Sequence, residues 1–336
     1  MSVRNFNIAI AGATGAVGQE IVAVLERRGF PVGECRLLAS SRSAGKTMRF
    51  RDQEVTVQEL SASAFKDIDI AFFSAGATRS REFAPAALES GALVVDNSSA
   101  FRMDPEVPLI IPEVNAEQMG DSMLIANPNC CAAILAVAIW PLHQKATLKR
   151  VVVSTYQSAS GAGAQAMEEL KDQVKAFAAG EEPKTEIFPY PIAFNVFSHN
   201  SAVAENGFND EENKLVQEVQ KIFSTPELEI VPTCIRVPVL RAHSEAVLMD
   251  FAETLSASEA REILASAPGV TLVDDVEGGH FPMPIEAAGE LDVHVGRLRD
   301  AGSSGRSVAL FISGDQLLKG AAWNAVQIAE TWIRKA

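Results

Sequence analysis

A glycine-rich turn near the start of the chain constrains the fold more than any other feature of the sequence. The apolar run Asn7–Ala11 has the length of a buried strand, and a helical pattern follows the turn. Between them, Gly12, Gly15 and Gly18 are spaced as G-x-x-G-x-x-G. Glycines at a strand-to-helix turn let the backbone approach a pyrophosphate, which then binds to N–H groups at the helix N-terminus. The turn therefore predicts a dinucleotide site, although the same residues could form a tight turn without a ligand.

The end of the expected second strand bears on which dinucleotide binds. An NAD site usually offers an acidic residue to the ribose 2′-hydroxyl roughly 20 residues after the glycines. Here the stretch Leu37–Ser43 carries hydroxyls and the guanidinium of Arg42 but no carboxylate. Such groups suit a 2′-phosphate, so the pattern favours NADP. The alternative is that Arg42 is a solvated charge on a loop.

Strand-like and helix-like segments alternate along the first third of the chain. Alternation of this kind predicts a parallel sheet covered by helices. After Cys130 the pattern changes, and helices and strands fit an α+β region, with a final amphipathic helix at about Gln316–Arg334. The expected strands are Arg36–Ala39, Asp69–Ser74, Leu93–Asp96, Leu109–Ile111, Met123–Ala126, Arg150–Tyr156, Ala246–Phe251 and Val270–Val273, and the expected helices are Glu82–Glu89, Ala132–His143, Ala164–Ala179 and Ser258–Ala267.

Charge and composition exclude several classes of protein. The formal net charge of -14 opposes binding to nucleic acid, which depends on Lys and Arg neutralising phosphates. No segment has the roughly 18 consecutive apolar residues needed to span a membrane. The start of the chain lacks the cleavage site of a signal peptide. The four cysteines include the adjacent pair Cys130 and Cys131, which is a poor disulfide framework, so we expect a reducing cytoplasm.

The segment Asn127–Cys131 is the candidate for a nucleophile. It lies between an expected strand and an apolar helix, which places a thiol at a helix N-terminus. The partial positive charge there favours the thiolate and lowers the thiol pKa. A cysteine before an apolar helix can equally be a buried packing residue.

Five groups of motifs, in order along nearly the whole chain, resemble the signatures of the aspartate-semialdehyde dehydrogenase family. They are Asp96–Arg102, Asn129–Cys130, Ser154–Gly163, Arg236–Val239 with His243–Glu245, and Lys319–Asn324. The resemblance implies the NADPH-dependent reductive dephosphorylation of L-aspartyl 4-phosphate to L-aspartate 4-semialdehyde, through a cysteine thioester, in lysine, methionine and threonine biosynthesis. Such chemistry needs a soft nucleophile, a proton shuttle and cations for the leaving phosphate.

The resemblance also implies a role for each matching residue. The catalytic residues are Cys130 as nucleophile, Gln157 as the amide that orients the acyl group, and His243 as general acid/base. Arg236 grips the α-carboxylate, Glu211 the α-ammonium, Arg102 and Lys214 the phosphate, and Asn129 stands beside the nucleophile. The expected cofactor contacts are Gly12, Thr14, Gly15, Ala16, Val17, Arg42, Ser43, Ser160, Gly161 and Asn324. No metal is expected.

The length of 336 residues suggests about two domains. We expect a Rossmann-type doubly wound NADP-binding domain over residues 1–130, to which the C-terminal helix over 316–336 returns. An α+β catalytic and dimerisation domain is expected over 131–315. The resemblance implies a homodimer or larger homo-oligomer and a small-molecule substrate with phosphate, with neither nucleic acid nor membrane as partner.

Several alternatives remain at this point. His243 could be a core histidine, Arg236 a structural ion pair, Arg102 a loop cap, and Glu211 with Lys214 a plain pair on a helix surface. A reductase for N-acetylglutamyl phosphate would share the thioester chemistry but would have no free α-ammonium for Glu211. A silent NADP-binding paralogue would be expected to lose Cys130, Gln157 or His243.

Two features depart from the family pattern. Cys131 stands where serine is more usual, which puts a second thiol beside the nucleophile. The segment from Phe197 to Phe208 is short, so the loop before Glu211 is not predicted.

Overall fold

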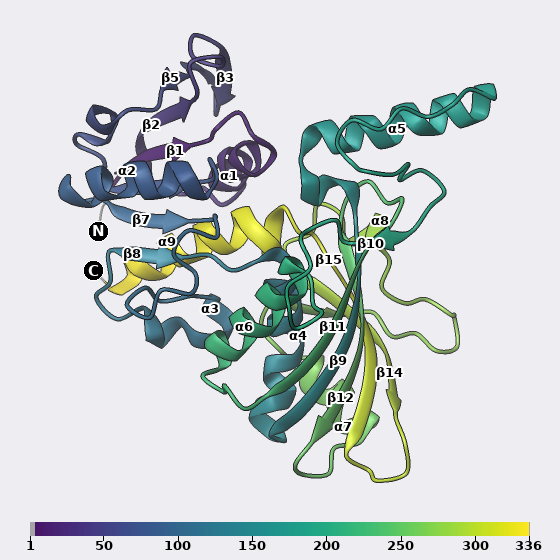
Figure 1. Cartoon of the computed structure of the whole chain (residues 1–336). Helices are drawn as coiled ribbons and strands as arrows, with labels where there is room; N and C mark the ends of the chain where they lie inside the picture. The colour runs from purple at the N-terminus through teal and green to yellow at the C-terminus, as the bar shows by residue number, and fades with distance from the viewer. Residues whose placement is uncertain (1–3, 336) are drawn as a thin grey trace. The chain divides into compact units, whose positions relative to one another are not determined.

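The structure is a computed structural model that describes residues 4–335, so the outermost ends of the expected ranges 1–130 and 316–336 lie outside it. Its contacts divide the chain into two compact units. The first contains the residues up to Asn129 together with the segment from Ala321, and the second is Cys130–Gly320. Figure 1 shows the two units coloured along the chain.

The first unit is built on a six-stranded sheet in the order β5-β2-β1-β6-β7-β8, and every pairing in it is parallel. This is the doubly wound architecture expected from the sequence. Its strands are β1 (Phe6–Ala11), β2 (Val32–Ala39), β5 (Gln58–Glu59), β6 (Ile70–Phe73), β7 (Leu93–Asp96) and β8 (Leu124–Ala126), and its helices are α1 (Ala16–Arg27), α2 (Ala77–Glu89), α3 (Pro112–Asn115) and α9 (Trp323–Lys335).

Alternating residues of these strands supply the two faces of the sheet. On one face, Ala71 and Phe73 of β6 pack against Ala84 and Ala87 of α2. The ring of Phe65 stacks on Phe73, with ring centroids 5.4 Å apart. Burial of each large apolar side chain stabilises the fold by about 1.5–3 kcal/mol. Helices α1 and α9 pack against each other, and α9 also contacts β7. The C-terminal helix is thereby an integral layer of this unit.

The strand expected at Leu109–Ile111 is wrong. Leu109 forms only an isolated bridge to Ala126, and Pro112 then begins α3, so the segment cannot continue as a strand. The structure also contains a hairpin of β3 (Thr47–Phe50) and β4 (Gln53–Thr56). These strands are largely exposed and lack a clear alternation of apolar residues, so no pattern in the sequence predicts them.

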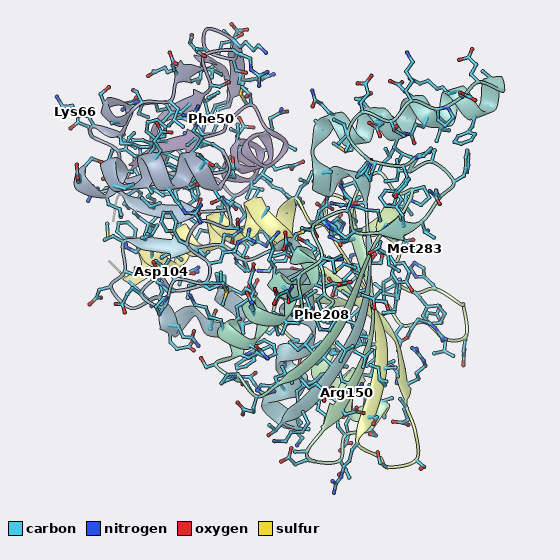
Figure 2. All side chains as sticks on the ribbon, viewed as in Figure 1. Phe50, Lys66, Asp104, Arg150, Phe208 and Met283 are labelled. Carbon is cyan, nitrogen blue, oxygen red and sulfur yellow. The ribbon has the colours of Figure 1, made fainter. Side chains whose placement is uncertain are left out.

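The second unit is built on a seven-stranded mixed sheet in the order β10-β11-β9-β12-β15-β14-β13. Figure 1 shows its long central strands lying side by side, with α4 and α6 on one face and α5 extending away from the sheet. Arg150 lies near the start of β9 (Figure 2) and pairs with Glu229 of β11 at 3.1 Å. The strands are β9 (Leu148–Gln157), β10 (Phe197–Ser198), β11 (Glu229–Arg236), β12 (His243–Phe251), β13 (Val270–Leu272), β14 (Val293–Asp300) and β15 (Ser307–Gly314), and the helices are α4 (Cys130–Lys145), α5 (Ala164–Ala179), α6 (Asp210–Phe223), α7 (Ala257–Leu264) and α8 (Pro284–Ala287).

Helix α4 has apolar residues on nearly every side, and nearly every side of it is buried. It contacts α6, α7 and four strands of the sheet. A helix without a polar face must be surrounded by protein, which explains why this one lies at the centre of the unit. Helix α6 is amphipathic by contrast and begins with a capping box formed by Asn209 and Glu212.

The final helix begins later than the sequence suggested. The residues Leu318–Ala322 form one turn of π-helix, and the α-helix starts at Trp323 and continues to Lys335. Among the described residues, no helix combines the length and apolar character needed to cross a membrane.

Candidate active site

Three of the expected site residues lie in one row across adjacent strands of the seven-stranded sheet. Arg236 on β11 is the register partner of Gln157 on β9. Ser244 on β12 pairs with Tyr156 of β9, which places His243 opposite Gln157 one step further along. Directly opposed residues point to the same face of a sheet. The sheet therefore presents a buried amide between a buried guanidinium and a buried imidazole.

Cys130 is the first residue of α4 and is half-buried, whereas Cys131 is fully buried. A hydrogen bond from the Cys131 thiol lowers the pKa of Cys130 well below its ordinary value, and His243 adds to this shift while burial opposes it. The same hydrogen bond, together with burial, raises the pKa of Cys131. The helix N-terminus also favours a thiolate. Of the two sulfurs, that of Cys130 is therefore the better candidate for a nucleophile.

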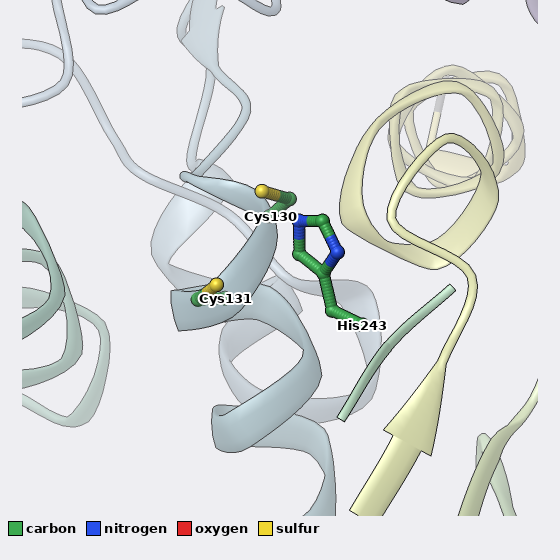
Figure 3. A group of neighbouring side chains, drawn as sticks. All are labelled: Cys130, Cys131 and His243. Carbon is green, nitrogen blue, oxygen red and sulfur yellow. The ribbon is translucent and has the colours of Figure 1, made fainter. Parts of the chain in front are cut away.

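His243 faces this thiol from the sheet. Figure 3 shows its ring edge turned towards Cys130 on the first turn of α4, and the donor atoms of Cys130, Cys131 and His243 all lie within 4.8 Å of one another. The Ser158 amide donates to Nδ1 at 3.0 Å, and the Ser158 hydroxyl lies at the same distance. Nε2 has no hydrogen-bond partner in the described part of the chain. A ring nitrogen that accepts an amide N–H carries no proton, so the proton of the neutral ring is on Nε2.

The same three donors could hold a metal ion. Two thiols and an imidazole are ligands that suit a thiophilic ion such as Zn²⁺. Their spacing of at most 4.8 Å is compatible with such an ion. The half-buried position of Cys130 and the lowered pKa of its thiol fit a nucleophile beside a proton carrier equally well.

Glu211 and Lys214 are not a plain surface pair. Glu211 lies in the first turn of α6, and its carboxylate is buried. One of its oxygens accepts from Nε2 of Gln157 at 3.2 Å, and the other lies 3.4 Å from Nζ of Lys214. The helix spacing of i and i+3 thus places an anion and a cation beside the amide of Gln157.

Arg236 is buried, and its hydrogen bonds go to neutral groups. Nη2 donates to Nε2 of His199 at 2.8 Å, and Nη1 donates to the carbonyl oxygen of Ser158 at 3.4 Å. The guanidinium also lies over the ring of Phe188, 5.7 Å from its centroid. No salt bridge to Arg236 occurs within residues 4–335. Its charge is therefore available to an anionic ligand. His199 had no motif that would have identified it.

Two glycines keep space open around these groups. A Cβ at Gly161 would lie 3.0 Å from Cε1 of His243 and 3.1 Å from Nη1 of Arg236. A Cβ at Gly320 would lie 2.7 Å from Cβ of Cys130. Ser160 accepts a hydrogen bond from the side chain of Gln316 and lies 3.0 Å from the Ser158 hydroxyl. The backbone at these two glycines can approach Cys130, His243 and Arg236 closely because glycine has no side chain.

The glycine turn of the first unit fits a dinucleotide pyrophosphate. Gly12 has a φ of +90°, and a Cβ there would lie 2.6 Å from the carbonyl oxygen of Ser74. A Cβ at Gly18 would lie 2.2 Å from the carbonyl oxygen of Gly12. Helix α1 begins directly after Gly15 without a side-chain cap, which leaves its first N–H groups for an anion. Thr14, Ala16 and Val17 complete this turn and the first turn of α1.

A cavity of about 360 Å³ opens beside this turn, and Gly12, Thr14 and Gly15 line it. Arg42 is exposed and Ser43 half-buried on the turn that follows β2, and neither belongs to the lining. The lining instead contains the cation Arg79, which sequence reasoning missed because a helix-surface arginine carries no motif. The other lining residues are Ala39, Ser40, Ser41, Glu59, Leu60, Ser74, Ala75 and Phe83.

The remaining expected residues belong to the first unit and are buried. Arg102 donates through Nε to the carbonyl oxygen of Asn127 at 2.9 Å and through Nη2 to that of Asn97 at 2.8 Å. Asn324 donates through Nδ2 to the carbonyl oxygen of Ile110 at 2.9 Å and to Oδ1 of Asn127 at 2.6 Å. Both side chains thus fix neighbouring loops.

Asn129 is buried and immediately precedes the nucleophile in the chain. Within the second unit, Cys130, His243, Gln157, Glu211, Lys214, Arg236, Ser160 and Gly161 are brought together by β9, β11, β12, the turn after β9 and the N-termini of α4 and α6.

Comparisons with known proteins agree with this geometry. Residues 7–122 match the family model of the semialdehyde dehydrogenase NAD-binding domain, and residues 139–319 match that of the semialdehyde dehydrogenase dimerisation domain. The aspartate-semialdehyde dehydrogenase of Synechocystis sp. is 51% identical over 98% of this chain and 97% of its own length. That of Bacillus subtilis is 43% identical over 98% and 97%, respectively.

Solved structures show the same likeness. Aspartate semialdehyde dehydrogenase II from Vibrio cholerae has a TM-score of 0.94 and 41% identity, covering 98% of this chain and 99% of the other. A structure of that enzyme complexed with ASA has the same TM-score and identity, with 99% of each chain covered.

Proposed function

The chain belongs to the aspartate-semialdehyde dehydrogenase family, and from this premise we propose how its own residues carry out the reaction. The protein is an NADP-dependent oxidoreductase that acts on an aldehyde group, and its reaction is the reductive dephosphorylation of L-aspartyl 4-phosphate to L-aspartate 4-semialdehyde. The observation that carries the mechanism is the thiolate-forming Cys130 beside a buried His243 whose Nε2 is unpartnered in the described residues.

The first step is acyl transfer to Cys130. Its thiolate sulfur attacks the acyl carbon of aspartyl phosphate and forms the C–S bond, while the C–O bond to phosphate breaks and phosphate leaves with both electrons of that bond. Lys214 and Arg102 are the cations assigned to the phosphate oxygens. Cations at this position stabilise the charge that accumulates on the leaving group.

The second step reduces the thioester. When NADPH is bound at the glycine turn, it supplies the hydride for this reduction. His243 holds a proton at Nε2, where it can be shared with the acyl oxygen as negative charge develops there. Cys130 is released as a thiolate when the C–S bond breaks and the aldehyde is formed. The resting state of the pair is thereby restored without an external base.

The amino-acid end of the substrate is assigned to Arg236 and Glu211. The guanidinium pairs with the α-carboxylate, for which its planar fork of donors is suited. The Glu211 carboxylate binds the α-ammonium, and Gln157, hydrogen-bonded to Glu211, orients the acyl group between them. A reductase for an N-acetylated substrate would have no use for a buried carboxylate at this position.

The deciding assay measures NADPH formation from aspartate semialdehyde with and without phosphate. We expect formation of NADPH that depends on phosphate, because the reverse reaction must return the acyl group from Cys130 to phosphate. Activity with N-acetylglutamate semialdehyde in place of aspartate semialdehyde would contradict the assignment of Glu211. An absence of turnover with both aldehydes would support the non-catalytic alternative.

We further propose that the protein works as a homodimer in the cytoplasm. The second unit matches the dimerisation domain of the family, which supports a homo-oligomer, and the face of the seven-stranded sheet away from α4 carries exposed Tyr156. All four cysteines are free thiols. A nucleophilic thiol must stay reduced to function, which is consistent with a reducing compartment.

A further inference from the structure

His199 lies beside Arg236 because the edge strand β10, which ends just before it, pairs with β11. Strand β10 pairs antiparallel with β11, with Phe197 opposite Arg236 and Ser198 opposite Ile235. The backbone amide of His199 then donates to the carbonyl oxygen of Cys234 at 2.8 Å, which extends this pairing. The register brings Nε2 of His199 to 2.8 Å from Nη2 of Arg236. This is the shortest hydrogen bond that the guanidinium makes.

We propose that His199, acting through Ser201, is a positioning residue that holds the Arg236 guanidinium and the Glu211 end of α6 in one hydrogen-bonded network. The network fixes the separation between the two groups assigned to the α-carboxylate and the α-ammonium. The inference rests on the proposed function, because it gives a role to the clamp for the amino-acid end of the substrate.

The network continues from His199 to the start of α6. Nδ1 of His199 lies 3.0 Å from the Ser201 hydroxyl and 3.3 Å from the Ser201 amide. The same hydroxyl accepts from the amide of Glu211 at 3.2 Å and donates to Oδ1 of Asn209, the capping residue of α6, at 3.4 Å. Two side chains thus join a guanidinium on a strand to the first turn of a helix.

A second tie runs from α6 back to β11. Glu212, next to Glu211, accepts through Oε1 from the backbone amide of Cys234 at 3.0 Å, two residues before Arg236. Its other oxygen accepts from the amide of Asn209 in the capping box. Helix α6 is therefore held against β11 by Glu212, while the loop segment with His199 and Ser201 sets the side-chain geometry.

His199 is neutral in the working range of pH. Burial, and then the positive charge of Arg236, lower its pKa to about 4, with smaller effects of the same sign from Lys214 and His243 and an opposing one from Glu211. Donors face both ring nitrogens, the Arg236 guanidinium at 2.8 Å from Nε2 and the Ser201 amide at 3.3 Å from Nδ1. Arginine offers only donors and makes the shorter contact, so Nε2 accepts and the ring proton belongs on Nδ1, where the Ser201 hydroxyl at 3.0 Å can accept it; in this tautomer the Ser201 amide does not donate to the ring. An uncharged ring in this tautomer joins the two partners.

The neutrality of His199 matters for substrate binding. A carboxylate in its place would form an ion pair with Arg236 and compete with the α-carboxylate of the substrate. An apolar residue would leave a buried donor without a partner, which is costly. A neutral acceptor orients the guanidinium without forming a salt bridge to it, so that its donors can still pair with an anionic ligand. This is the physical difference between a positioning role and a structural ion pair.

Two amide substitutions at position 199 distinguish the link to Arg236 from the link to Ser201. Gln at position 199 can place its oxygen near the original Nε2, whereas Asn reaches only as far as Nδ1. His199→Gln therefore keeps the link to Arg236, and His199→Asn loses it. His143→Asn is the matched control, because His143 is a partly buried histidine whose Nδ1 accepts the Leu148 amide at 3.1 Å, away from the site.

The measurement is the initial rate in the phosphorylating direction on the full-length enzyme, with aspartate semialdehyde, phosphate and NADP varied in turn. For His199→Asn we expect the KM for aspartate semialdehyde to rise roughly tenfold while the KM for phosphate changes less than about twofold. His199→Gln should restore most of the loss, and His143→Asn should leave all three constants unchanged. Thermal unfolding of each variant reports on the fold.

Equal increases in the KM for both substrates, or a failure of Gln to rescue, would overturn the positioning role and leave the proposed function intact. If His199→Asn does not fold, Ser201→Ala removes the other link of the network, between His199 and the start of α6, and should raise the same KM by a smaller factor. A silent Ser201→Ala would then overturn the proposal. A wild-type enzyme without phosphate-dependent turnover of aspartate semialdehyde would overturn both the proposed function and this inference.

Discussion

The backbone amide of Ser158 donates to Nδ1 of His243 across 3.0 Å, and this contact determines what the ring can offer to Cys130. Because the donor is a backbone group, substitution of the Ser158 side chain leaves it in place. With Nδ1 occupied as an acceptor, Nε2 is the ring nitrogen that carries a proton towards the thiol. The largest effect on the pKa of Cys130 then comes from Cys131, whose thiol donates a hydrogen bond to it.

Cys130→Ser should lower kcat by at least about a thousandfold, because a neutral hydroxyl lacks the nucleophilicity of a thiolate. NADP binding and the melting temperature should be unchanged. Cys131→Ser should be mild, within about threefold in kcat, because the hydroxyl can still donate to Cys130. Steady-state rates and NADP titration of both variants test this. Loss of activity only in the second variant would show that Cys131 is the nucleophile.

Cys131→Ala should change the pH dependence of Cys130. The thiolate is the reactive form, so the rate of alkylation by iodoacetamide falls as the pH drops through the pKa of Cys130. Removing the Cys131 donor removes the largest cause of the lowered pKa, so the midpoint of the profile should move to higher pH. Cys35→Ser is the control, since burial raises the pKa of Cys35 to about 12. An unchanged midpoint would mean that His243 and the helix N-terminus suffice.

Arg42→Ala should weaken NADP binding much more than NAD binding, because the charge-assisted hydrogen bonds to a 2′-phosphate contribute on the order of 1.5–3 kcal/mol. Fluorescence titration with each cofactor measures the difference. Arg79→Ala belongs in the same experiment because Arg79 lines the cavity beside the glycine turn and Arg42 does not. If the discrimination against NADP appears only in Arg79→Ala, the 2′-phosphate contact belongs to α2. Arg49→Ala, on the exposed β3, is the matched control.

Arg102→Lys and Arg236→Lys should impair the binding of different ligands. Each substitution keeps a charge but loses the planar fork that pairs with an oxyanion through two bonds. In the phosphorylating direction, Arg102→Lys should raise the KM for phosphate most, and Arg236→Lys should mainly impair the use of aspartate semialdehyde. Both should also lower kcat, because positioning contributes to the barrier. The same profile for both variants would refute the assignment of the two arginines to different groups of the substrate.

The fold and the chemical groups of the site were largely readable from local patterns, whereas their supporting contacts were not. The glycine turn and the cysteine before α4 each lie within a few residues, and their spacing carries their meaning. Strand Leu93–Asp96 and helix Ala164–Ala179 have the bounds that were predicted, because a buried apolar run defines the strand and a glycine ends the helix.

The contacts that depend on register could not be predicted. His199 meets Arg236 only because β10 pairs with β11 in one particular alignment, and a two-residue strand has no periodicity to detect. Arg79 lines the cavity from the surface of α2, whereas Arg81 on the same helix does not. The Leu109–Ile111 error has the same origin, since an apolar triplet is compatible with either a strand or a buried loop.

The alignment of Arg236, Gln157 and His243 on three neighbouring strands determines the distances between their side chains. Neighbouring strands lie about 4.8 Å apart whatever side chains they carry, so the spacing of these groups is set by backbone hydrogen bonding and is insulated from drift in surface loops. Shortening or lengthening the acyl chain that such an enzyme accepts must therefore come from side-chain length within the row or from the helices above it. Substitutions in the surrounding loops therefore leave this spacing unchanged, because it depends only on which strands are paired.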